Sequence, residues 1–127
     1  MSKVKYYKVE IQPFHTPVDI IIAKDISIGM KWVNKNLLPK LKFKNIENEK
    51  DTLGLYAWRY KENKEYNLIF LREDSSDSTI IHECFHAIMR ISYDRGAEYS
   101  KESDEFFAYS FGNFTGEVLD LFYGRKK

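Results

Sequence analysis

The sequence predicts an α+β domain in which a small sheet of about four strands is covered by helices. Four segments carry the apolar spacing of strands and three carry that of helices. They follow one another as ββα, ββ and αα, which is not the regular alternation of a parallel α/β fold. A chain of 127 residues has room for one domain, so we expect residues 1–127 to fold together.

The first half of the chain should form two strands and a helix. Residues 3–12 alternate apolar and charged side chains with period two, as a half-buried strand does. Residues 18–23 are almost wholly apolar and predict a second, more buried strand. Asp25 or Ser27 can cap the helix that follows, and Pro39 ends it.

The second half should form a hairpin and two helices. Residues 52–60 and 65–72 resemble strands and flank the polar loop 61–64, which predicts a hairpin. A run of Ser and Asp then offers several helix caps, and a helix should cover residues 79–93. A last helix should cover residues 103–122.

Composition excludes several classes of protein. The 20 basic and 19 acidic residues leave a net charge of +1, which gives no electrostatic basis for a nucleic-acid partner. The single cysteine, Cys84, cannot form an internal disulfide and suits a reducing compartment. The apolar run at residues 20–23 is far shorter than the ~20 residues of a membrane span. No secretory signal precedes it, so we expect a cytoplasmic protein without membrane association.

Residues 82–86 read His-Glu-Cys-Phe-His, an HExxH motif inside a predicted helix. Positions i and i+4 share one face of a helix, so His82 and His86 can present two imidazoles to one metal ion. Glu83 lies about 100° farther round the helix, too far to join both histidines as a ligand. It can reach a water on the metal and serve as general base.

The helix that carries the motif should bury one face and open the other to a cleft. Cys84 should pack in the core of the protein rather than bind metal. The predicted apolar face consists of Ile80, Ile81, Cys84, Phe85, Ile88 and Ile91. The opposite face should carry His82, Glu83 and His86, together with Arg90 and Tyr93.

A catalytic zinc usually has three protein ligands, so a third must come from elsewhere. The metzincin layout fails, because Met89 and Ser92 stand where its glycine and histidine would be. Asp94 lies near the end of the same helix, where its side chain is poorly oriented to bind the same metal ion as the histidines. A glutamate on the next helix is the remaining layout, and Glu105 fits it.

Glu105 should fall at the edge of the buried face of the last helix, where Ala108 and Gly112 let two helices come close. Glu98, Glu102 and Asp104 remain open as alternatives. Tyr109 is one turn beyond Glu105 and would hydrogen-bond a ligand, stabilise an oxyanion or simply pack.

The region from Thr79 to Phe122 resembles the zincin metallopeptidases, and its layout is closest to that of the gluzincins. The Glu-x-x-Ala segment that starts at Glu105 is similar to the ligand helix of small bacterial and phage zincin-like proteins. The resemblance implies a minimal zincin-like domain, with a small sheet, an HExxH helix and a glutamate-bearing helix. It implies His82, His86 and Glu105 as zinc ligands and Glu83 as the base.

In zincins the strand before the HExxH helix often lines the cleft and pairs with an extended peptide, so residues 66–71 are either such a strand or an ordinary strand of the sheet. One departure is that no histidine follows His86, whereas thermolysin-like enzymes add a further catalytic histidine on a second lobe. Transition-state stabilisation would then depend on a Tyr or an Arg.

The sequence therefore predicts a zinc-dependent hydrolase, specifically a peptidase that acts on a peptide or protein. Two histidines and a carboxylate also serve non-heme iron, but the HExxH helix favours zinc. Because one small lobe offers little surface for selection, a second copy or a partner protein would complete the cleft. The alternative is a zinc-binding protein of zincin fold with a non-catalytic role in interaction or assembly, encoded by a phage or mobile element.

Overall fold

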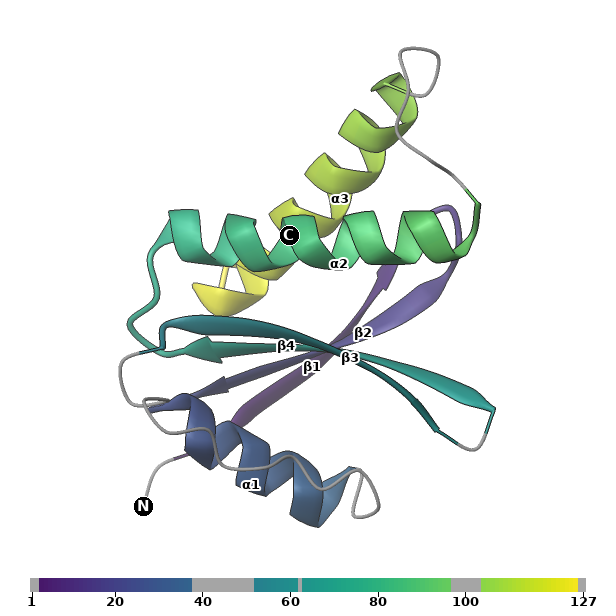
Figure 1. Cartoon of the computed structure of the whole chain (residues 1–127). Coiled ribbons are helices and arrows are strands. Elements are labelled where there is room, and N and C mark those ends of the chain that lie inside the picture. The colour runs from purple at the N-terminus through teal and green to yellow at the C-terminus, as the bar shows by residue number, and fades with distance from the viewer. Residues whose placement is uncertain (1–2, 38–51, 62, 97–103, 126–127) are drawn as a thin grey trace.

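The computed structural model describes residues 3–37, 52–61, 63–96 and 104–125. These residues form a small α+β fold of four strands and three helices, as the sequence predicts (Figure 1). The strands are β1 (Lys5–Ile11), β2 (Thr16–Ala23), β3 (Gly54–Lys61) and β4 (Lys64–Arg72). The helices are α1 (Ile26–Asn36), α2 (Asp77–Asp94) and α3 (Asp104–Phe122).

The strands form one mixed sheet in the order β1-β2-β4-β3. Strands β1 and β2 pair antiparallel, as do β3 and β4, and the two pairs join through the parallel neighbours β2 and β4. The predicted hairpin at residues 61–64 is confirmed by the pairing of Lys61 with Lys64. Because β4 is paired on both sides, β3 is the edge of the sheet nearest the HExxH helix among the described residues.

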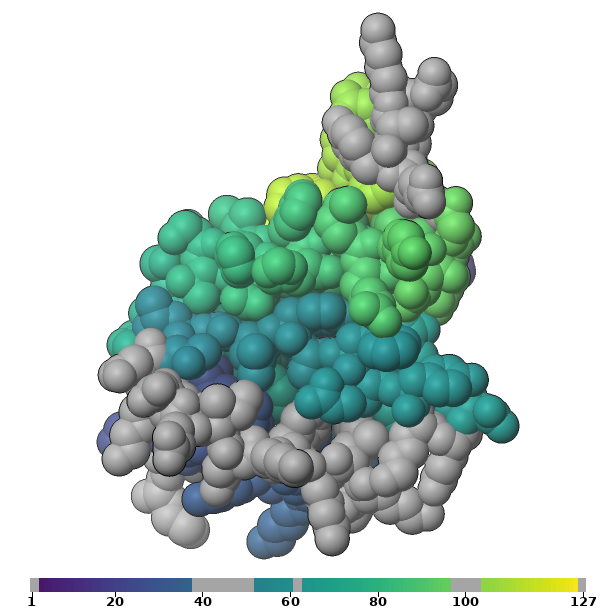
Figure 2. Space-filling model, viewed as in Figure 1, coloured from purple at the N-terminus to yellow at the C-terminus, as the bar shows by residue number. Residues whose placement is uncertain are grey.

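The helices cover both faces of the sheet, with α1 on one face and α2 and α3 on the other (Figure 1). On the viewed side of the molecule, the surface of α2 lies directly along that of β3 (Figure 2). Asp25 caps α1, because its carboxylate accepts a hydrogen bond from the backbone N–H of Ile28 at 2.9 Å. Ser76 caps α2 in the same way, through the N–H of Thr79.

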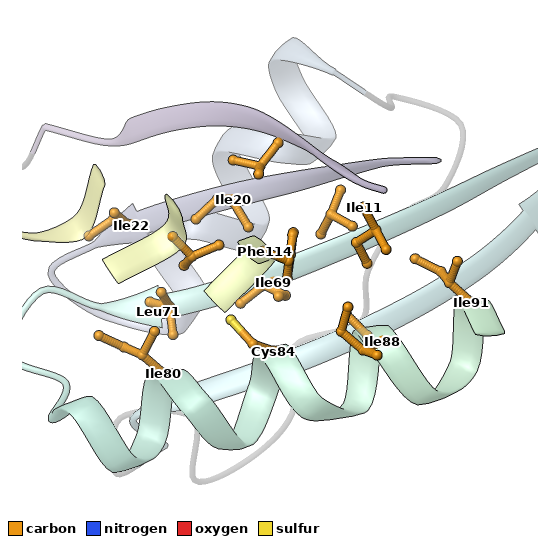
Figure 3. Close-up of a cluster of buried hydrophobic side chains, with 14 of the residues drawn as sticks. Ile11, Ile20, Ile22, Ile69, Leu71, Ile80, Cys84, Ile88, Ile91 and Phe114 are labelled. Carbon is orange, nitrogen blue, oxygen red and sulfur yellow. The ribbon is translucent and has the colours of Figure 1, made fainter. Parts of the chain in front are cut away.

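The larger core lies between the sheet and the helices α2 and α3 (Figure 3). Cys84 is fully buried there, as the sequence predicts, and Phe114 of α3 fills the centre. This packing fixes the inner face of α2 and so determines which of its side chains face outward. The strand residues in this core are Val9, Ile11, Val18, Ile20, Ile22, Ile69 and Leu71, and α2 adds Ile80, Ala87, Ile88 and Ile91.

Among the described helices, none combines the length and the apolar content that crossing a membrane requires.

Candidate metal centre

The two histidines of the motif lie on the outer face of α2 and turn toward each other. Their Nε2 atoms are 3.0 Å apart, and their ring centroids are separated by 4.6 Å. Two nitrogen ligands of a tetrahedral zinc, each about 2.05 Å from the ion, would lie ~3.3 Å apart. The observed spacing is within a few tenths of an ångström of that separation, so His82 and His86 fit a shared metal ion.

The helical wheel predicts Glu83 on the exposed face with the histidines. The structure contradicts this prediction. Glu83 is only 8% exposed and turns toward β3. The reason is that β3 packs against the flank of α2, so the helix buries this flank as well as the face on the core. The carboxylate accepts a hydrogen bond from the backbone N–H of Tyr56.

The electrostatic environment of Glu83 is mixed. Burial raises the pKa of its carboxyl group above the usual range. The charges of His82 and His86, and the hydrogen bond from Tyr56, act in the opposite direction but do not cancel the effect of burial. A carboxyl whose pKa is raised above its usual range holds a proton more readily than an ordinary glutamate, as a general base must.

Gly54 lets the edge strand approach α2 closely. A Cβ atom at this position would lie 2.9 Å from Cγ2 of Thr79 and 3.0 Å from Cγ of Glu83, closer than side chains tolerate. The approach leaves an open hollow of about 480 Å³ beside the motif. Its lining consists of Leu53, Gly54, Ser78, Thr79, His82 and Glu83. The hollow gives a ligand access to His82 and Glu83 together.

The backbone of β3 directs polar groups toward this site. The carbonyl of Leu53 accepts a hydrogen bond from the N–H of Arg72, which makes that pair a hydrogen-bonded one in the antiparallel ladder. By alternation, the N–H and C=O groups of Gly54, Tyr56 and Trp58 point away from β4. The prediction that residues 66–71 pair with a peptide is wrong, because β4 is central and both of its edges are occupied.

The structure does not bring Glu105 to the histidines. Glu105 is exposed in the first turn of α3, and Tyr109 is 66% exposed. The face that α3 turns toward the core carries Phe107, Phe114 and Val118 instead. Within the described ranges, no three His, Cys, Asp or Glu residues lie close enough to hold a metal ion.

Two other candidates for the third ligand, Asp104 and Asp94, lie in different surroundings from Glu105. Asp104 lines an apolar groove between α2 and α3, together with Phe85 and Met89. Asp94 forms an ion pair with Arg90 at 3.3 Å, so it does not face the histidines as a ligand would. Glu98 and Glu102 lie outside the described residues.

The predicted apolar face of α2 also includes two residues that are exposed in the structure. Ile81 is 38% exposed and Phe85 is 51% exposed, so neither belongs to the core. Phe85 instead meets Phe111 of α3 edge to face, with their ring centroids 5.9 Å apart. Phe85 and Phe111 both line the groove between these two helices.

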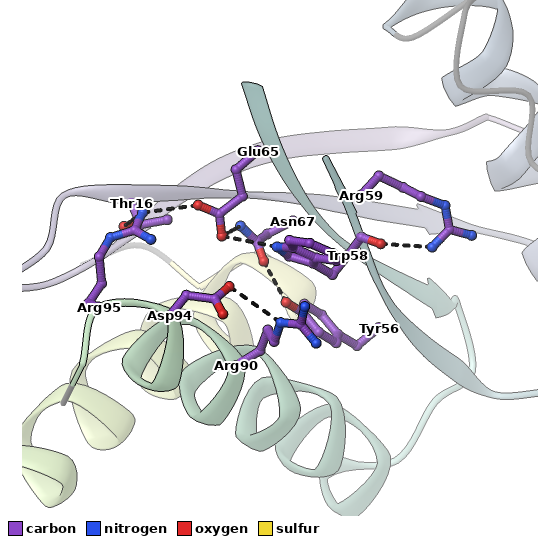
Figure 4. Close-up of polar contacts among 9 residues, drawn as sticks. All are labelled: Thr16, Tyr56, Trp58, Arg59, Glu65, Asn67, Arg90, Asp94 and Arg95. Atoms are coloured by element: carbon purple, nitrogen blue, oxygen red, sulfur yellow. Dashed lines mark hydrogen bonds and ion pairs between the residues drawn. The ribbon is translucent and has the colours of Figure 1, made fainter. Parts of the chain in front are cut away.

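A polar cluster that the sequence reasoning missed lies farther along α2 (Figure 4). The Tyr56 hydroxyl donates to Oδ1 of the buried Asn67 at 2.5 Å, and Asn67 donates to Glu65 at 3.0 Å. Burial raises the pKa of the Tyr56 hydroxyl. Burial acts in the same sense on Glu65, but hydrogen bonds from Asn67, Arg95 and Trp58 outweigh it and lower the pKa of that carboxyl.

Two members of this cluster connect it to the motif. The guanidinium carbon of Arg90 lies 4.0 Å from the centroid of a Trp58 ring. Tyr56 contacts Glu83 through its N–H and Asn67 through its hydroxyl. The alternation of Tyr56, Trp58 and Tyr60 along one face of a strand is the signal that would have pointed to this aromatic row.

No family model matches the chain, and no curated protein or solved structure matches it.

Proposed function

We propose that the protein is a zinc-dependent hydrolase that cleaves a peptide or protein. The observation that supports this most strongly is the convergence of two imidazole nitrogens beside a buried carboxyl. His82 and His86 offer ligand atoms at a separation that suits one ion, and Glu83 is the next residue along the same helix. This combination of donor atoms and base matches the requirements of metal-assisted hydrolysis.

In this proposal His82 and His86 hold the metal, and the third ligand is a carboxylate that the described residues do not bring beside them, with Glu105 as the first candidate. Glu98, Glu102 and Asp104 are the alternatives for that third position. The bound zinc ion would supply a Lewis acid that lowers the pKa of a coordinated water to about 7. Tyr109 remains the candidate for stabilising negative charge on the reacting carbonyl.

Glu83 acts as the base through one oxygen while the other is held in place. The carboxylate has two oxygens, so one can accept the N–H of Tyr56 while the other stays available to take a proton. Glu83 takes the proton from the attacking water and passes it to the leaving amine.

The edge of β3 is where the substrate would lie. Outward-pointing backbone groups of Gly54 and Trp58 can pair with an extended peptide, as strand addition requires. The hollow beside Gly54 would then admit the peptide next to His82 and Glu83. A partner protein or a second copy of the chain would complete the cleft on its open side.

The test is a screen for hydrolysis of unstructured protein and of mixed peptides by the zinc-loaded protein. Glu83→Gln is the matched control, because its amide keeps the acceptor for the Tyr56 N–H but cannot take a proton. Cleavage by the wild type that is lost in Glu83→Gln supports the proposal. Cleavage that persists in Glu83→Gln contradicts it.

A second candidate is a zinc-binding protein with a non-catalytic role in interaction or assembly. One observation favours it, because the Glu83 carboxylate already has a structural partner in the N–H of Tyr56. In that case Glu83 would serve to fasten the edge strand to α2. Glu83→Gln would then bind zinc normally, and no peptide would be cleaved by either form.

A further inference from the structure

Arg90 is the next charged side chain along the outer face of α2 after the motif. It stands four residues beyond His86, about 6 Å along the axis. Its side chain is 43% exposed. Helical side chains lean toward the N-terminal end of their helix, so the guanidinium of Arg90 leans back toward the motif.

The guanidinium of Arg90 is fixed in place on two sides. Its plane lies over Trp58 of β3, and its Nε donates to Oδ2 of Asp94 at 3.3 Å. Figure 4 shows the group beside Trp58 and Tyr56, with the dashed contact to Asp94 on its Nε side. An arginine held in this way loses little rotational freedom when it binds a further group.

The two terminal nitrogens of Arg90 have no acceptor among the described residues. Other arginines differ in this respect. Arg72 donates to Asp74 through both Nε and Nη2, and Arg95 donates through Nη2 to Thr16 and Glu65. Arg90 therefore presents a fixed and partly solvated fork of N–H groups next to the candidate metal centre.

Tyr56 connects this fork to the candidate base. Its backbone N–H contacts the Glu83 carboxylate, and its ring lies beside the Arg90 guanidinium (Figure 4). Tyr56 thus contacts Glu83 through its backbone and lies beside Arg90 through its ring. A peptide that runs along β3 advances about 3.3 Å per residue, so one or two residues would cover the helical turn from His86 to Arg90.

We infer that Arg90 binds a carboxylate of the substrate, one or two residues beyond the bond that is cleaved. This inference rests on the proposed function, and it adds the chemical class of substrate that the site selects. A planar guanidinium with both terminal nitrogens available pairs with a carboxylate through two parallel hydrogen bonds. That carboxylate belongs either to the C-terminus of the peptide or to an Asp or Glu side chain.

The test measures binding in the Glu83→Gln protein, so that it does not depend on hydrolysis. The probes are acetylated tetra-alanine with a free C-terminal carboxylate and the same peptide with a C-terminal amide. Binding is followed by NMR through the backbone amide signals of the protein, which every variant retains. Because a hydrogen bond to a charged group contributes about 1.5–3 kcal/mol, the free acid should bind at least about tenfold more tightly.

Further variants identify the residue and the source of the carboxylate. Adding Arg90→Gln should abolish the preference for the free acid, and Arg90→Lys should keep only part of it. Arg59→Gln is the matched control and should keep the full preference, because Arg59 donates to the carbonyl of its neighbour Trp58. An amidated peptide that regains tight binding when it carries one Glu assigns the contact to a side-chain carboxylate.

Equal binding of acid and amide, a preference that survives Arg90→Gln, or no binding at millimolar concentration would overturn the inference. The outcomes for the proposed function are separate. A wild-type protein that cleaves the acid and the amide equally well is a hydrolase, but it does not select carboxylates through Arg90. A protein that cleaves neither, while its Glu83→Gln form prefers the acid, binds carboxylates without being a peptidase.

Discussion

Replacing Gly54 by alanine should destabilise the protein by forcing β3 and α2 apart. The new Cβ would lie 2.9 Å from Cγ2 of Thr79 and 3.0 Å from Cγ of Glu83, so at least one element must shift. Overpacking of this kind costs about 1–3 kcal/mol. The lower entropy of the unfolded alanine chain returns about 0.4–1 kcal/mol, so we expect a net loss of about 1–2 kcal/mol.

Urea unfolding followed by tryptophan fluorescence measures this loss. Gly112→Ala is the control, because apart from the adjacent residues and the backbone of α3 itself no described atom lies within 4 Å of a Cβ placed at that position. It should instead stabilise the helix by about 0.5–1 kcal/mol. A Gly54→Ala protein as stable as the wild type would refute the close approach of β3 to α2.

A double-mutant cycle identifies the contact that causes the loss. Thr79→Ser removes the Cγ2 methyl that the new Cβ would meet and keeps the N–H that Ser76 accepts. Combined with Gly54→Ala, it should recover at least ~0.5 kcal/mol relative to the sum of the single changes. If the effects of the two changes are additive, the new Cβ does not clash with the methyl group of Thr79.

Four further predictions concern the buried groups Cys84 and Glu83. Burial raises the pKa of the Cys84 thiol to about 12, so a disulfide reagent should not modify folded protein at pH 8 and should modify one thiol per chain in urea. Because the folded thiol stays protonated while the unfolded one ionises, Cys84 should cause stability to fall as the pH rises above about 8.5, and Cys84→Ser should reduce that slope. Glu83→Gln should lower hydrolysis at least about 100-fold with zinc content unchanged, and zinc loss or retained activity would contradict its role as base. In the metal-free protein the pKa of Glu83 is raised by burial, so its contribution to stability should fall as the pH rises through the carboxyl range, and Glu83→Gln should remove that dependence.

Local patterns were sufficient to predict the elements of the fold. The Asp25 cap, the hairpin loop and the burial of Cys84 depend on neighbours in sequence or on one helical face. The order of the strands could not be predicted, because the parallel contact between β2 and β4 joins segments far apart in the chain. That contact places β4 in the centre of the sheet, which is why the expected peptide-pairing strand was wrong.

Prediction of the site was limited for a similar reason. A helical wheel assumes that a helix meets the protein on one face, whereas α2 meets the core on one face and β3 on its flank. Glu83 is buried by the second contact, which its own sequence neighbourhood does not reveal. Spacing alone placed Glu105 beside the metal, but the packing of Phe107 and Phe114 turns the other face of α3 inward.

The most direct test of the central claim is the metal content of the purified protein by elemental analysis. Wild type, His82→Ala, His86→Ala and Glu105→Ala are compared, with His15→Ala as the control because His15 lies in the exposed turn between β1 and β2. The account predicts about one zinc per chain in the wild type and in His15→Ala, and none in the other three. If Glu105→Ala is the only one of these three variants to retain zinc, the third ligand is Glu98, Glu102 or Asp104 instead. No zinc in the wild type after zinc is supplied, or full zinc in both His82→Ala and His86→Ala, would contradict the account.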